Sequence, residues 1–438
     1  MVVASAVAVP FRLGWKVKAP PFAGEVEVPN LAMVPVVLAV GVWLAVRLPG
    51  WSARLPWRRL LLVAGLVALG WGCALALVRG PSGLTRGLEG RFEYPAVVAQ
   101  VDRIGAGPFV DTFTDPAVLR RYPVHVQGHP PGAALLFVGL DRVGLGGPAG
   151  AALFLALAGS TTAPAVLLAV RDVAGERRAR QAMPFLVLAP AAIWTVSSAD
   201  ALYAAVGAWA VTLLVLASGR GPARSGSAGL AVAGGLLFGL GVQLSYGLGP
   251  LALVPLTVLV ARRRWRVLAG AAAGAAAVMA AAAVAGFWWP DGLAATHARY
   301  VAGVASDRPF AYFALLGNPA AVAVALGPAV AVALARVRDG RLWLLAGGAL
   351  AALVAADLTG LSKAEVERIW LPFVPWLLVL AAGLADGAPA GLLVGGAGPV
   401  DRCPERRSPV PWSAAASSLL VVQVGTAVLV ESVVHTVW

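Results

Sequence analysis

Long apolar stretches alternate with short polar or basic segments along the whole chain. A helix needs roughly 20 predominantly apolar residues to cross a hydrocarbon layer ~30 Å thick. The stretches that meet or approach this length are 31–46, 60–78, 148–170, 182–196, 201–216, 228–244, 248–260, 267–288, 318–335, 342–356, 369–384 and 414–430. The pattern predicts an all-α integral membrane protein with about 12 transmembrane helices in a single polytopic domain, 1–438. Pro250 and Pro255 make the seventh stretch irregular.

Composition supports a lipid environment. Hydrophobic residues make up 59% of the chain and charged residues only 13%, whereas soluble domains carry about a quarter charged residues. Cys73 lies in a predicted helix and Cys403 in a loop on the basic side, so a disulfide between them is not expected. The opening 30 residues lack the order of a signal peptide, because their apolar run precedes their basic residues.

The basic residues sort by side of the membrane. Of the 34 lysines and arginines, 20 fall in alternate loops, within 47–59, 171–180, 220–224, 262–266, 336–341 and 402–407. With their six neighbouring acidic residues these loops carry +14, against −1 for the other side. Such an excess predicts that they face the cytoplasm. The net charge of +13 is then explained by topology and lipid headgroups, and a nucleic-acid partner is not needed. Arg12, Lys16 and Lys18 fit this alternation poorly, since it places them outside.

The opposite, extracytoplasmic loops carry the candidate chemistry. The longest is 79–147, far longer than an ordinary connection, and 289–317 and 357–368 are further loops of this side. Aromatic residues give the long loop material to fold against the membrane surface. Within it, 133–143 is apolar but too short to span, and Asp141 and Arg142 interrupt it. We expect an interfacial helix there.

Carboxylates of the long loop are candidates for a general base. Glu93 lies between Phe92 and Tyr94, and Asp102, Asp111 and Asp115 follow. Removing a proton from an acceptor hydroxyl requires a base at hydrogen-bond distance in the bound complex. The alternative for any one of them is a solvated loop charge.

Two further constellations are candidates for binding phosphate. His125 and His129 precede a Pro-Pro corner, where Gly128 and the prolines disfavour the helix that a metal pair would need, so hydrogen bonding to phosphate or anchoring of the loop is favoured. The stretch 361–370 places Lys363, Glu365, Glu367 and Arg368 before an apolar helix, as a phosphate clamp or an interfacial salt-bridge cluster. If it is helical, Lys363 pairs with Glu367.

These two stretches carry a resemblance. A carboxylate-plus-aromatic loop, then His-Pro-Pro and an interfacial helix, resembles the membrane-embedded GT-C glycosyltransferases, especially protein O-mannosyltransferases and aminoarabinose transferases. Asp200 fits their pattern as well. Gly128-His129-Pro130-Pro131-Gly132 and the stretch 362–373 are more similar to the actinobacterial family that includes the mycobacterial methylthioxylose transferase of lipoarabinomannan.

The resemblance implies an inverting transfer of a sugar, such as methylthioxylose or another pentose or hexose, from a polyprenyl-phosphate donor to an envelope glycan or lipoglycan such as lipoarabinomannan. It implies a multi-pass protein of the cytoplasmic membrane with its active site on the extracytoplasmic face. The chain departs from the mannosyltransferases in one respect: it has Gly90-Arg91-Phe92-Glu93 where they carry an adjacent Asp-Glu pair. No nucleotide-binding glycine motif is present, in agreement with a lipid-linked donor.

We therefore predict an enzyme with Glu93 as the base, Asp102 being the next candidate. His129, Lys363 and Arg368 are expected to bind the donor phosphate. The expected substrate-binding residues are polar side chains of the same side of the membrane: Tyr94, His125, Asp200, Tyr246, His297, Tyr300, Glu365 and Glu367. No cofactor or metal is indicated. The rival hypotheses are a transporter or flippase for a lipid-linked sugar and a non-catalytic subunit of an envelope assembly.

Overall fold

A computed structural model describes residues 19–26, 32–219, 227–303, 305–386 and 412–436. Within them the named secondary-structure elements are helices, apart from one two-stranded antiparallel sheet. In this sheet β1 (Gly24–Val26) pairs with β2 (Val434–Thr436). The loop residues Arg220, Arg224 and 401–407, with Cys403, lie outside this part of the chain, as do Arg12, Lys16 and Lys18.

Eight helices of the described residues are long and apolar enough to cross a membrane. They are α2 (Val34–Arg54), α3 (Trp57–Ala76, extended to Arg79 by η1, Leu77–Arg79), α9 (Gly147–Ser160) joined to α10 (Thr162–Ala174), α12 (Ala199–Ala217), α13 (Ser227–Leu244), α15 (Trp265–Val284), α20 (Gly340–Leu358) and α23 (Ala414–Val433). Large apolar side chains such as Leu62 and Leu66 are exposed on their outer faces. This is the surface that a bilayer covers.

The prediction of about 12 spans is not confirmed, because four apolar stretches are broken by proline or glycine. The helix that begins at Phe310, made of α17 (Phe310–Tyr312), η8 (Phe313–Gly317) and α18 (Asn318–Leu326), meets α19 (Pro328–Arg336) at 101°, and counting this bent pair as one span gives nine. Gly327 adopts a positive φ of 75° at the bend.

The other three stretches form shorter elements. They are α11 (Glu176–Val187) with η6 (Pro190–Trp194), η7 (Tyr246–Ala252) with α14 (Leu253–Ala261), and α22 (Val374–Leu378) with η9 (Val379–Leu384). The irregularity expected around Pro250 is present, since 3-10 geometry precedes α14.

The loops gather at two ends of the helical bundle. At one end, which we call the basic end, Arg178 donates to Asp339 and Asp386, and Arg262 donates to Asp172. At the other, the site end, Arg79 at the end of η1 pairs with Glu431 of α23. Each of these pairs joins loops that the alternation of charge assigned to one side. The orientation relative to the cytoplasm stays a prediction.

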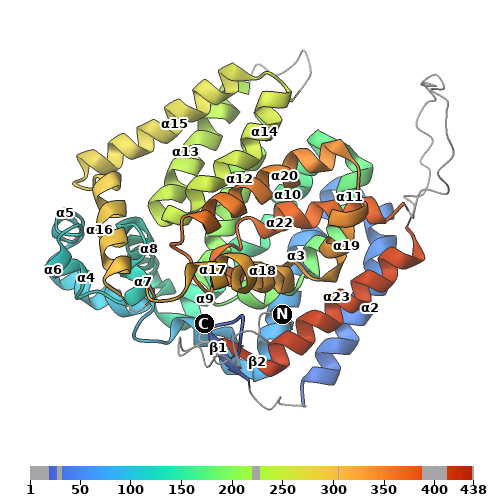
Figure 1. Cartoon of the computed structure of the whole chain (residues 1–438), viewed down its shortest axis with the longest axis horizontal. Helices are drawn as coiled ribbons and strands as arrows, with labels where there is room; N and C mark the ends of the chain where they lie inside the picture. The colour runs from blue at the N-terminus through green and yellow to red at the C-terminus, as the bar shows by residue number, and fades with distance from the viewer. Residues whose placement is uncertain (1–18, 27–31, 220–226, 304, 387–411, 437–438) are drawn as a thin grey trace.

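The long loop folds into short helices at the site end: η2 (Pro81–Leu84), η3 (Arg86–Leu88), η4 (Tyr94–Val97), α4 (Val98–Ile104), α5 (Ala106–Asp111), α6 (Pro116–Leu119), α7 (Val124–Gln127), α8 (Pro131–Leu140) and η5 (Asp141–Leu145). Figure 1 shows α4–α8 beside α16 (Trp289–Val301) on one side of the molecule. α8 forms where the sequence predicts a short helix, and its place at a membrane surface stays a prediction.

α13 and α15 pack closely because glycines face the neighbouring backbone. A Cβ at Gly235 would lie 2.1 Å from the carbonyl oxygen of Ala271, and one at Gly274 would lie 2.4 Å from that of Val232. Small residues that let helix backbones approach are the usual basis of helix association in membranes. α12 packs against α13, α9 and α10 and is the most buried of the spans. It therefore provides a rigid support for the residues of its first turn.

Candidate functional site

A carboxylate and an imidazole of the long loop form a close pair. Glu93 precedes η4, and its Oε2 lies 2.8 Å from Nδ1 of His125 in α7. The backbone N–H of His125 donates to the carbonyl of Phe92 at 3.2 Å, which fixes the two segments side by side. The side chains of Glu93 and His125 remain 12% and 17% exposed. Both are therefore within reach of a substrate from the site end.

His129 packs against two tyrosines. α7 ends at Gln127, so the two histidines do not share a helix, in agreement with the effect expected of Gly128 and the prolines. Nδ1 of His129 donates to the carbonyl of His125 at 3.0 Å, and its ring contacts the rings of Tyr94 and Tyr203. Burial lowers the pKa of His129 to about 4. The ring is then neutral at pH 7, with Nε2 as an acceptor, so donation to a phosphate would require the ring to be protonated.

Two tyrosines connect the long loop to α12. The hydroxyl of Tyr203 donates to that of Tyr94 at 3.1 Å, and both side chains are buried. Tyr94 also stacks on Phe137 of α8, with ring centroids 4.9 Å apart. Burial raises the pKa of Tyr94 well above its ordinary value, so its hydroxyl stays protonated. The pair is a neutral hydrogen-bonded bridge.

The second charged pair is formed by α12 and α21 (Val366–Ile369). Nη1 of Arg368 donates to Oδ2 of Asp200 at 2.6 Å, and the Ser198 hydroxyl donates to the same oxygen at 2.9 Å. Glu365 lies 3.4 Å from the other terminal nitrogen of Arg368. Burial alone would lower the pKa of Arg368, but Asp200, Glu365 and Glu93 together raise it. Arg368 thus remains a cation, and Glu93 lies within its electrostatic range.

The backbone before α21 is not helical. Ala364 and Glu365 both adopt positive φ, 72° and 66°, a conformation that side chains rarely take. Asn318 holds this turn: its amide donates to the carbonyl of Ser362 at 2.7 Å and to Asp357 at 2.7 Å, and its oxygen accepts from the N–H of Ala364 at 3.2 Å. The turn directs Arg368 towards Asp200.

Lys363 lies on the other side of this turn. Its Nζ donates to the carbonyl of Ser306 at 3.0 Å and lies 5.9 Å from the ring centroid of Tyr300. Because the turn separates Lys363 from α21, the helical pair of Lys363 with Glu367 does not form, and Glu367 is fully buried. We call the linked polar residues of the site end the cluster: Glu93, Tyr94, His125, His129, Asp200, Tyr203 and Arg368. Lys363 lies outside it, in the neighbouring loop.

The remaining predicted residues lie outside the cluster. Asp102 is exposed and 3.3 Å from the exposed Arg142, Asp111 is exposed, and Asp115 caps α6 by accepting from the N–H of Ala117. Tyr246 contacts Trp289, and Tyr300 donates to the carbonyl of Gly360. His297 is exposed on α16. Of the candidate bases, only Glu93 thus faces the cluster.

Two residues of the site were missed from the sequence. Tyr203 lies three residues after Asp200, so the helical period alone places both on one face of α12, and this signal was available. The contacts of Asn318 depend on the turn at Ala364, which the sequence does not indicate.

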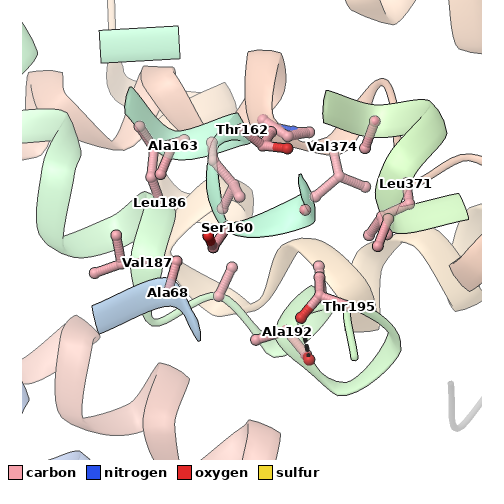
Figure 2. A pocket seen from close by; sticks show the side chains of 17 residues that line it. Ala68, Ser160, Thr162, Ala163, Leu186, Val187, Ala192, Thr195, Leu371 and Val374 are labelled. Carbon is pink, nitrogen blue, oxygen red and sulfur yellow. Dashed lines mark hydrogen bonds between the residues drawn. The ribbon is translucent and has the colours of Figure 1, made fainter. Parts of the chain in front are cut away.

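The structure also contains an apolar pocket (Figure 2). Its empty space of about 590 Å³, part of it open to the outside, is bordered by α3, α9–α12, η6 and α22. Ala201 and Ala204 line it from the same turns of α12 that carry Asp200 and Tyr203. Leu371 lines it three residues after Arg368, and Thr195 three residues before Ser198. On three segments the residues that line the pocket are thus close in sequence to Asp200, Arg368 and Ser198.

The part of the chain described by the structure contains no group of three or more His, Cys, Asp or Glu side chains placed to hold a metal ion. Fold and composition together define a multi-pass, all-helical membrane protein with a polar cluster at one end of its bundle. Comparison with models of known protein families and with curated protein sequences finds no match to this chain.

Proposed function

We propose that the protein is an inverting glycosyltransferase that uses a polyprenyl-phosphate sugar as donor. The observation that carries this proposal is an apolar pocket whose lining residues Ala201 and Leu371 lie one and three residues from Asp200 and Arg368, the two members of a buried ion pair. A polyprenyl-phosphate sugar has the same division: an apolar chain attached to a phosphate and a sugar. The pocket suits the first part of the chain, and the Arg368 cation suits the phosphate. Glu93 and His125 then face the acceptor.

In the proposed reaction the acceptor oxygen forms a bond to the anomeric carbon of the sugar while the bond from that carbon to the phosphate oxygen breaks. The acceptor proton passes to the Glu93–His125 pair, and polyprenyl phosphate leaves beside Arg368. The acceptor we propose is an extracytoplasmic envelope glycan or lipoglycan such as lipoarabinomannan, with a pentose, methylthioxylose or a hexose as the sugar. The likeness of 128–132 and 362–373 to the actinobacterial transferases supports this assignment.

The distribution of charge favours an enzyme over a transporter. Transporters place ionisable groups near the bilayer midplane, often at broken helices. In the described part of this chain, the pairs Arg178–Asp386 and Arg262–Asp172 lie at the basic end, and Arg79–Glu431 and Arg368–Asp200 at the site end. The break between α18 and α19 is flanked by apolar residues.

The test is glycan analysis of a strain that lacks the protein, followed by transfer in vitro. Mass spectrometry of the envelope glycans should show the loss of one sugar, restored by the wild-type chain but not by Arg368→Gln. Purified protein in liposomes should then move that sugar from its polyprenyl-phosphate form to the deficient glycan. A flippase would instead move the donor across the liposome bilayer without transfer. A non-catalytic subunit would do neither, and either result contradicts the proposal.

A further inference from the structure

The pair of Glu93 and His125 defines which nitrogen of the imidazole is available. A carboxylate can only accept a hydrogen bond, so Nδ1 of His125 is the donor at 2.8 Å. The neutral ring then carries its lone pair on Nε2. Among the described residues, Nε2 of His125 makes no hydrogen bond, and the side chain is 17% exposed. Nε2 of His125 is thus a free basic atom of the pair, beside Oε1 of the Glu93 carboxylate.

The chemistry of the two groups favours Nε2 of His125 as the general base. A general base works best when its pKa lies near the operating pH. Imidazoles have an ordinary pKa of about 6.5, against about 4.3 for the carboxyl of glutamate. A carboxylate behind an imidazole also holds the ring in one tautomer and stabilises the imidazolium that forms.

The second histidine does not compete for this role. His129 uses its Nδ1–H on the carbonyl of His125, and burial lowers its pKa to about 4. Its ring contacts those of both Tyr94 and Tyr203, whereas the ring of His125 contacts that of Tyr94. A neutral His129 beneath His125 also adds no repelling charge when His125 takes up a proton.

The charged and titratable groups around the pair come from four segments. They are Glu93 and Tyr94 at η4, His129 after α7, Asp200 and Tyr203 on α12, and Glu365 and Arg368 at α21. Arg368 acts on Glu93 at long range and is itself paired with Asp200.

We propose that Nε2 of His125 is the atom that removes the proton from the acceptor hydroxyl, and that Glu93 is a positioning residue. This rests on the proposed function. In the step, the acceptor oxygen bonds to the anomeric carbon as the bond to the phosphate oxygen breaks. The hydroxyl proton moves to Nε2, and the resulting imidazolium is stabilised by the Glu93 carboxylate. Polyprenyl phosphate leaves with the electron pair of the broken bond.

The experiment compares variants of the full-length chain in liposomes, using a radiolabelled polyprenyl-phosphate sugar as donor. His125→Asn keeps an N–H donor towards Glu93 but has no basic atom, and we expect its kcat to fall by about 10² to 10⁴. Glu93→Gln should retain more activity than His125→Asn. Glu93→Asp should restore the rate in part.

His125→Gln repeats the test with a longer amide side chain, in case His125→Asn does not fold. Binding of the donor shows which variants are folded. His435→Asn, the same change in β2 outside the cluster, should leave the rate unchanged. The proposal is overturned if His125→Asn and His125→Gln retain near-normal turnover while Glu93→Gln abolishes it, since Glu93 itself would then be the base. A wild-type protein that transfers no sugar would instead refute the proposed function.

Discussion

Nη1 of Arg368 lies 2.6 Å from Oδ2 of Asp200, although 168 residues separate them in the chain. Their side chains are 9% and 4% exposed, so the pair is removed from water. Through it the turn that holds Ala364 and Glu365 is fixed to the first turn of α12. This turn and the pocket-lining residues Ala201 and Ala204 of α12 therefore share one structural support.

Removing either partner of this pair should destabilise the protein. A buried charge left alone costs about 3 to 5 kcal/mol of unfolding free energy. We expect Asp200→Asn and Arg368→Gln each to cost about that much, and the double variant to cost less than the two together, because residues in contact are not additive. Unfolding of the detergent-solubilised variants by denaturant measures the free energy of unfolding of each member of this double-mutant cycle. Additive effects would show that the two side chains stabilise the fold independently.

Acid should weaken the fold through His129. Its pKa is about 4 in the folded protein against an ordinary value of 6.5. Between these values the unfolded chain binds a proton that the folded chain does not, so stability falls as pH drops from 6.5 towards 4 and is unaffected by this group above 6.5.

The matched variant is His129→Asn, which keeps a donor for the carbonyl of His125 but does not titrate. The difference in unfolding midpoint between wild type and variant should change across pH 4 to 6.5. A difference that is constant over that range would show that His129 titrates normally.

The contact of α13 with α15 should not tolerate a methyl group at Gly235. The added Cβ would lie 2.1 Å from the carbonyl oxygen of Ala271, a backbone atom that cannot rotate away. Overpacking of this kind costs about 1 to 3 kcal/mol. Gly229, on the same helix, has nothing within 4 Å of its Cβ position. Gly235→Ala should therefore lower the thermal unfolding midpoint and Gly229→Ala should not, and equal effects would contradict the packing.

Surface labelling should separate the two ends of the bundle. In a variant without Cys73 and Cys403, single cysteines are placed at exposed positions: Arg263 and Arg338 at the basic end, and Arg121 and Leu361 at the site end. An impermeant thiol reagent added to intact cells should reach only the second pair, because the basic loops are expected inside. Labelling of Arg263→Cys and Arg338→Cys instead would place the candidate site in the cytoplasm.

The sequence predicts where individual membrane-spanning helices lie better than it predicts how many there are. Helices such as α2, α12 and α23 follow from apolar length alone, since a bilayer imposes one criterion on every crossing segment. The predicted count of 12 spans is not confirmed, because short breaks within apolar stretches end or bend the helices. Gly327 with its positive φ turns α18 from α19, and Pro190 follows the end of α11. Such breaks matter little to mean hydropathy but end a helix.

The candidate site shows the same limit. Glu93 and His125 were both selected from the long loop, and so were Asp200 and Arg368 from distant segments, because polar residues at helix ends stand out in so apolar a chain. Which carboxylate meets which base was not predictable. Asp102 was the next candidate after Glu93, yet it lies on the exposed surface beside Arg142. Likewise, the left-handed backbone at Ala364 removes Lys363 from the cluster.

The pairing of β1 with β2 sets an order on the assembly of the protein. Glu25 is opposite His435, so a segment that precedes α2 finds its partner only after α23 has been synthesised. Arg79 strengthens the junction by donating to the backbone carbonyls of Glu431 and Val434. During translation, β1 therefore remains unpaired while the spans between it and β2 are inserted. The two strands can pair only after α23 has been made, and a truncation before Val434 would leave β1 without its partner.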